Sequence, residues 1–228
     1  MFIHLAHPVD PDGFAWPGEP IADVQADSVI GTSGKPFNSY VTTPPNHFAT
    51  HMDGPHHFNT VGDSFNDLPV ERFGFEGPDV LVADIPQCCT RAALVKKEDL
   101  EPFADQLKGK RFLLLRTGFE KYRDSDPTFY QMEGPSLHPD LCQWLNEEFP
   151  ELDCVAMDWL SVASPTNDYG EEAHHWLLGN YTDHIITAIE DMPMAELGDK
   201  TIKVITLGPL RVKGVDSSQV CAMAWVED

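Results

Sequence analysis

The chain has 228 residues and a mass of 25.4 kDa, which is long enough to bury a hydrophobic core. Hydrophobic residues make up 42% of it, a composition typical of globular proteins and not of disordered ones. The 37 acidic and 15 basic residues give a formal charge of -22, and such a negative field repels nucleic acid and anionic lipid. We therefore expect no nucleic-acid or membrane partner, and a small-molecule ligand.

The N-terminal residues "MFIHLAHPVDPDGFAWPGEP" lack the basic region and apolar run of a signal peptide. No stretch approaches the roughly 18 apolar residues of a membrane span. The five cysteines are odd in number and mostly far apart, which favours reduced thiols. We expect a cytoplasmic protein.

Six short apolar runs rich in branched residues predict strands along the chain. Between the first and the second run, residues 8–78 contain frequent proline and glycine, which predict loops and short β-segments. The six runs cover residues 2–5, 79–85, 111–117, 153–158, 184–189 and 202–207.

Two segments between these runs predict helices. Residues 96–107 form the weaker one, interrupted by Pro102. In residues 136–149, apolar side chains recur every three or four positions, and Ser136 is the expected N-cap. Strands alternating with helices indicate an α/β protein, but βαβ spacing is too irregular for a doubly wound sheet. We predict a mixed, partly barrel-like β-core with a few flanking helices, in one domain over residues 1–228.

The stretch "NHFATHMDGPHHF" at residues 46–58 concentrates candidate metal ligands. His47 and His51 are four residues apart and share one side of a helical turn, whereas His51 and Asp53 share one side of an extended segment. Gly54 and Pro55 prevent a helix from continuing. A turn followed by an extended stretch would therefore bring His47, His51 and Asp53 to one ion, and zinc and manganese both accept such ligands.

Two further histidines follow the proline. His57 is near the same centre and suits either a second ion or acid/base catalysis, because histidine titrates near neutral pH. His56 points the other way if the segment is extended. A single loop histidine is most often structural, and the spacing also permits an ion that only holds loops together, in a metal-binding protein without catalysis.

These residues resemble the signature HxGTHxDxPxH of the cyclase and kynurenine formamidase family of metal-dependent hydrolases. Ala49 stands where that family prefers glycine. The matching positions are His47, Thr50, His51, Asp53, Pro55 and His57.

Five other segments resemble elements of the same family, in the same order. They are "WPGEP" at 16–20, "LLLRTGF" at 113–119, "MDWLSV" at 157–162, "HHWLL" at 174–178 and "TLGPLRVKGVDSSQVCAMA" at 206–224. The likeness spans almost the whole chain and implies the family's swivelling β/β/α fold.

The resemblance implies that His47, His51 and Asp53 bind a first divalent ion, zinc or manganese, and that His57 is the acid/base residue. In family members with two ions, a later histidine and a glutamate bind the second and share the aspartate. His174 and Glu190 are the corresponding candidates here. The neighbouring His175, Glu171 and Glu172 are rivals for these two positions.

The implied activity is hydrolysis of a small amide by metal-activated water, with N-formylkynurenine as the leading substrate. A cyclic amide such as isatin, or a lactone, is the alternative. No GxSxG, GxxxxGK[ST] or GxGxxG motif indicates a different chemistry. Trp16 and Phe48 are expected to contact the substrate, and the family implies a homo-oligomer, either a dimer or a tetramer.

Overall fold

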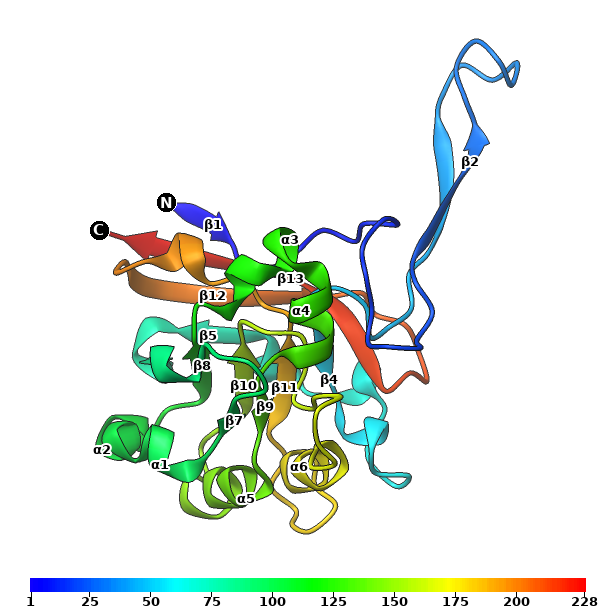
Figure 1. Ribbon diagram of the computed structural model, residues 1–228. Helices are drawn as coiled ribbons and strands as arrows, with labels where there is room; N and C mark the ends of the chain where they lie inside the picture. Colours follow the sequence, from blue (N-terminus) through cyan, green and yellow to red (C-terminus); the bar gives the residue numbers. More distant parts are fainter.

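A mixed nine-stranded sheet forms the centre of the computed structural model, which describes residues 1–228 (Figure 1). The short strand β1 (Phe2–His4) pairs with the long strand β13 (Ser217–Glu227), so the two termini lie side by side. Apart from β1, the strands follow one another across the sheet in the order β5 (Gly74–Glu76), β12 (Thr201–Pro209), β13, β4 (His51–Asp53), β11 (Thr187–Glu190), β10 (Cys154–Met157), β8 (Phe112–Arg116) and β6 (Val80–Asp84).

The sheet has a parallel half and an antiparallel half, which meet at β4. Strands β6, β8, β10 and β11 run parallel to one another. Strand β4 pairs antiparallel with both β11 and β13 and so joins the two halves. Two small sheets lie outside the main one: β2 (Asp23–Ser28) with β3 (Ser39–Thr43), and β7 (Leu94–Val95) with β9 (Ser136–Leu137).

Short helices pack on the parallel half of the sheet. The predicted helix at 96–107 is present as two turns, separated by a 3₁₀ turn that contains Pro102. The second predicted helix begins at Pro139, and His138 is its N-cap, whereas Ser136 lies in β9, so the expected capping role of Ser136 is wrong. The helices are α1 (Lys97–Leu100), α2 (Ala104–Leu107), α3 (Tyr122–Ser125), α4 (Pro127–Glu133), α5 (Pro139–Glu148) and α6 (Gly170–Leu177).

The parallel half of the sheet is buried on both faces because it separates two hydrophobic cores. Successive side chains of β8 alternate between them: Leu113 and Leu115 pack beneath the helices, whereas Phe112 and Leu114 face the interior enclosed by the antiparallel strands. All six predicted strands are present, and the expected mixed, partly barrel-like α/β fold is confirmed. None of the helices is long and apolar enough to span a lipid bilayer.

Replacement of a core valine tests this architecture. Val155 in β10 is 0% exposed, so Val155→Ala is expected to lower the free energy of unfolding by about 1.5–3 kcal/mol, measured by urea denaturation. The matched change Val61→Ala, at a residue 90% exposed, should alter it by less than about 0.5 kcal/mol. Equal effects of the two changes would contradict the described core.

Candidate metal centre

Strand β4 places two candidate ligands on one face at the junction of the sheet. His51 and Asp53 are separated by one residue and therefore point the same way. Glu190, the last residue of β11, is the direct antiparallel partner of His51, so its side chain lies on that face too. The three ligand atoms of His51, Asp53 and Glu190 lie within 4.8 Å of one another.

A left-handed turn before β4 orients His51. Ala49 has a φ of 55°, the conformation that glycine adopts most easily, and its carbonyl accepts a hydrogen bond of 2.8 Å from Nδ1 of His51. This bond keeps the Nδ1 proton in place and directs the lone pair of Nε2 at the carboxylates.

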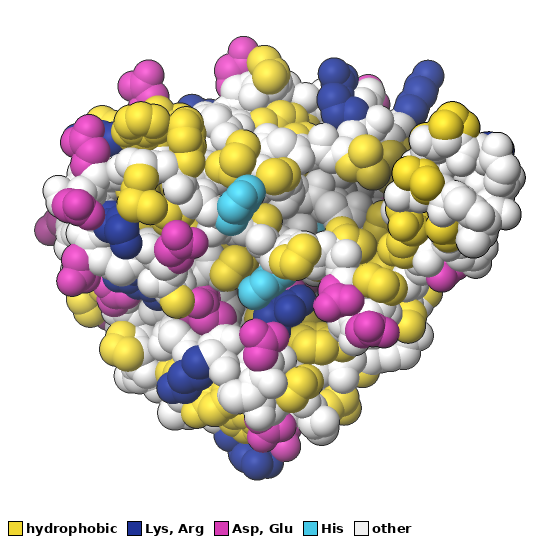
Figure 2. Space-filling model, turned by 90° about the horizontal axis from the view of Figure 1, so that it is seen from above, with side chains coloured by type: hydrophobic (Ala, Val, Ile, Leu, Met, Phe, Trp, Pro, Cys, Tyr) yellow, Lys and Arg dark blue, Asp and Glu magenta, His cyan; other side chains and the backbone are white.

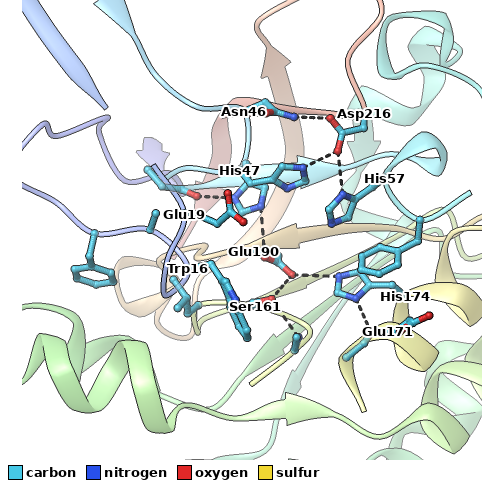
Figure 3. Close-up of a pocket in the computed structure, with 18 residues that line it drawn as sticks. Trp16, Glu19, Asn46, His47, His57, Ser161, Glu171, His174, Glu190 and Asp216 are labelled. Atoms are coloured by element: carbon cyan, nitrogen blue, oxygen red, sulfur yellow. Dashed lines mark hydrogen bonds and ion pairs between the residues drawn. The ribbon is translucent and has the colours of Figure 1, made fainter. Parts of the chain in front are cut away.

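Helix α6 contributes His174 in the same way (Figure 3). Its Nδ1 donates to the carbonyl of Gly170 at 2.6 Å, and its Nε2 lies 3.6 Å from Oδ2 of Asp53 and 3.7 Å from Oε1 of Glu190. Gly170 lets the start of α6 approach Ala163, since a Cβ at this glycine would lie 2.4 Å from the Cβ of Ala163. His174, and not its neighbour His175, therefore joins the cluster.

The buried polar atoms of this cluster fit a divalent cation. Asp53 is 1% exposed, yet neither of its carboxylate oxygens has a hydrogen-bond partner, and neither does Nε2 of His51. Oδ1 of Asp53 faces His47 at 2.9 Å and His51 at 3.4 Å, whereas Oδ2 faces His174. Buried groups without partners destabilise a fold unless something compensates them, and imidazole with carboxylate is a suitable donor set for zinc or manganese.

Without an ion, the histidines must carry protons to balance the carboxylates. Burial disfavours the charge, but the neighbouring carboxylates of Asp53 and Glu190 outweigh it and raise the pKa of His174 to about 9. Burial is likewise outweighed at His47, where two carboxylates raise the pKa to about 9. Burial and Asp53 both oppose the charge of Glu190, yet the neighbouring histidines lower its pKa to about 2.

Asp216 connects the cluster to His57 and was missed by the sequence analysis. Its Oδ2 accepts from Nδ1 of His57 at 2.9 Å and lies 2.7 Å from Nε2 of His47, while Asn46 donates to its Oδ1 at 2.6 Å. Gly54 allows this approach, because a Cβ there would lie 2.9 Å from the Asp216 carbonyl. Only the segment match at 206–224 could have drawn attention to Asp216.

Ser161 is a second contact that the sequence did not reveal. Its hydroxyl donates to Oε1 of Glu190 at 2.8 Å, and the backbone N–H of Val162 donates to the same oxygen at 2.7 Å. These two bonds hold one oxygen of Glu190, so the other faces His51 at 3.4 Å.

A cavity of about 450 Å³ opens beside the cluster. Trp16 lines it, as does His57, whereas His56 is exposed and points elsewhere. Phe48 does not line it: this side chain is 1% exposed and packs in a small core with Ala15. Phe48, which we expected to contact substrate, therefore lies in this core and not in the cavity wall, because the turn between the two histidines directs it inward.

Comparison with known proteins identifies the family. Residues 3–164 match the family model described as "Putative cyclase", and the chain belongs to that family.

Individual relatives agree with this assignment. An uncharacterized protein of Haemophilus influenzae is 39% identical over 135 residues, which is 58% of this chain and 92% of that protein. A kynurenine formamidase of Bacillus cereus is 29% identical over 222 residues, covering 97% and 96% of the two chains. Among solved structures, isatin hydrolase A from Labrenzia aggregata, bound to benzyl benzoate, superposes with a TM-score of 0.81 at 19% identity, covering 100% of this chain and 94% of that one, and shares the fold.

The raised histidine pKa values predict pH-dependent metal binding. The protonated forms of His47 and His174 stabilise the metal-free fold below about pH 6.5, and this contribution is lost as the pH rises through 9. Because an ion must displace these protons, zinc or manganese affinity should increase between pH 7 and pH 9, about tenfold per pH unit for each proton released. Competition with a chromophoric chelator measures the slope.

His174→Gln should lower the number of protons released on metal binding by one, and the slope of affinity against pH should fall accordingly. His56→Gln should leave the slope unchanged. A slope of zero in the unmodified protein would contradict protonated histidines at the centre.

Proposed function

We propose that this protein is a metal-dependent hydrolase that cleaves the C–N bond of a small amide, of the arylformamidase type. The observation that supports this most strongly is the buried, unpartnered carboxylate of Asp53 among histidines at the edge of a cavity. A cluster that only held loops together would need no cavity beside it. Similarity to kynurenine formamidases over 97% of the chain favours the same class.

In this proposal His47 and His51 hold one divalent ion, zinc or manganese, on the Oδ1 side of Asp53. His174 and Glu190 hold a second ion on the Oδ2 side, so the aspartate is shared. The positions of the histidines support this assignment to two ions, because His47 and His51 lie near Oδ1 of Asp53 whereas His174 lies near Oδ2. A divalent cation bound there supplies Lewis acidity, which activates water and polarises a carbonyl group.

His57 is proposed to move the proton. It lines the cavity, and its Nδ1 hydrogen bond to Asp216 leaves Nε2 to accept a proton or to deliver one to the leaving nitrogen. Asp216 acts through His57 as a positioning residue, because a carboxylate at Nδ1 fixes both the ring orientation and the tautomer.

The cavity walls suit a flat aromatic amide. Trp16, Phe14, Phe58 and Leu160 supply apolar surface, and Ser161 and the metal ligands lie on the polar side. N-formylkynurenine has this character and is the proposed substrate. Isatin, a cyclic amide, is the second candidate, because the chain shares its fold with isatin hydrolase A. We also propose that residues 1–228 form one domain and that the protein is a homo-oligomer.

The direct test is hydrolysis of N-formylkynurenine by the purified protein loaded with zinc or manganese, with isatin and a lactone assayed in parallel. Chelation should abolish turnover, and His57→Ala should lower kcat by about 10²–10⁴-fold with the bound metal unchanged. His56→Ala is the matched control and should keep full activity. An inactive metal-loaded protein on all three substrates would favour a non-catalytic metal site.

Asp216→Asn tests the positioning role. It preserves the shape of the side chain but removes its charge, so kcat should fall about 10–100-fold while KM changes little. Asp63→Asn, at an exposed carboxylate, should have no effect. If Asp216→Asn raised KM alone, its contact with His57 would not orient the proton carrier.

A further inference from the structure

The residue that follows Glu190 has a backbone conformation that residues with a Cβ rarely adopt. Asp191 has a φ of 52°, in the left-handed region, and it is 1% exposed. Such a conformation persists only when the surrounding contacts hold it. The contacts around Asp191 therefore determine the path of the chain directly after a candidate metal ligand.

Two side chains from neighbouring helices hold the carboxylate of Asp191. Arg123 of α3 donates from Nε to Oδ1 at 3.0 Å and to Oδ2 at 3.1 Å, and its Nη2 lies 3.0 Å from Oδ2. Tyr130 of α4 donates its hydroxyl to Oδ1 at 2.6 Å. Burial and the negative charge of Asp191 raise the pKa of Tyr130 well above its ordinary value, so the phenol keeps its proton and remains a donor. We call Arg123, Tyr130 and Asp191 the clamp.

Burial distinguishes the ion pair of the clamp from pairs on the surface. The face of the molecule seen from above carries acidic and basic side chains interspersed with hydrophobic ones (Figure 2). Exposed pairs contribute little to stability. The side chains of Arg123 and Asp191 are only 14% and 2% exposed, so loss of one partner would leave a largely buried charge uncompensated. The clamp therefore holds the left-handed turn firmly.

The backbone of Asp191 joins the clamp to the strand that carries other candidate ligands. Its N–H donates to the carbonyl of Trp159 at 2.9 Å, and its carbonyl accepts a hydrogen bond from the hydroxyl of Thr50. The same hydroxyl accepts from the N–H of His7 at 2.8 Å, so its own proton is directed at Asp191. Thr50 directly precedes His51, and the clamp therefore ties the end of β11 to the start of β4.

The clamp can act on the metal centre only through the ligands. None of its three residues lines the cavity, so none contacts an ion or a substrate there. Glu190 is the direct partner of His51 across the two strands that the clamp ties together. Its Oε2 lies 3.4 Å from Nε2 of His51, and its Oε1 lies 3.7 Å from Nε2 of His174. A shift of the turn directly after Glu190 would change both distances at once.

We propose that the clamp positions Glu190 and thereby sets the affinity of the centre for the ion on the Oδ2 side of Asp53. This inference rests on the proposed two-ion centre. The clamp stabilises the left-handed turn, and the turn keeps the Glu190 carboxylate between His51 and His174. Loss of the contacts that orient a metal ligand lowers metal affinity about 10–100-fold.

Titration of the metal-free protein with manganese, followed by the electron paramagnetic resonance signal of the free ion, tests this role. The unmodified chain should bind two ions, and Asp191→Ala should weaken the binding of one of them about 10–100-fold. Glu190→Gln should weaken the same ion. Because the clamp acts through Glu190, the double variant Glu190→Gln/Asp191→Ala should bind this ion about as weakly as Glu190→Gln alone.

Asp191→Gly separates positioning from packing. Glycine adopts the left-handed conformation without help from the clamp, so Asp191→Gly should bind the ion more tightly than Asp191→Ala does. A residue that only filled space would not be replaced better by the smaller glycine. Tyr130→Phe keeps the packing and removes a single hydrogen bond to Asp191, so it should weaken the same ion by a smaller factor. It decides the question even where Asp191→Ala does not fold.

Asp153→Asn is the matched control. Asp153 pairs with Arg111 at 2.6 Å next to the start of β10, whereas Glu190 lies at the far end of the adjacent parallel strand β11. Loss of this ion pair should lower the free energy of unfolding without changing the affinity for either manganese ion.

Two kinds of result would overturn the inference. If Tyr130→Phe and the Asp191 variants bound both ions as tightly as the unmodified chain, or if Asp191→Gly bound no better than Asp191→Ala, the clamp would not position Glu190, and the metal centre itself would stand. An unmodified chain that bound fewer than two manganese ions would contradict the two-ion centre and the inference together.

Discussion

The buried carboxylate of Asp53 is the constraint around which the structure is organised. Both of its oxygens lie without hydrogen bonds at the strand where the parallel and antiparallel halves of the sheet join. A carboxylate in such a place is tolerated only beside positive charge. Three histidines from a turn, a strand and a helix provide it when protonated, and a divalent cation at this position would provide it as well. The elements that converge on β4 therefore carry histidines that can compensate the charge of the aspartate.

The features predictable from sequence were local ones. Apolar runs indicated the strands because burial on both faces of a sheet requires continuous hydrophobic residues. His51 and Asp53 could be grouped because a strand repeats every two residues, and β4 has that form. Glu190 became a candidate only through the resemblance to a family, since its place opposite His51 depends on the pairing of β11 with β4, which no local pattern indicates.

The features that escaped prediction depend on long-range contacts or on direction. Asp216 meets His57 across 159 positions of sequence, and Ser161 meets Glu190 across 29. No periodicity encodes such pairs. Phe48 lies between two candidate ligands in sequence, yet its side chain enters a separate core, because neighbouring residues in a tight turn point in different directions.

Ala49 shows how backbone strain and the site are connected. A left-handed conformation costs a residue with a Cβ about 1–2 kcal/mol, a cost that glycine avoids. The family signature prefers glycine at this position, and the turn is retained here with alanine. The left-handed turn directs the Ala49 carbonyl at Nδ1 of His51, which keeps the opposite nitrogen aimed at Asp53. The strain persists because relaxing it would turn His51 away and leave the buried carboxylate with one less compensating charge.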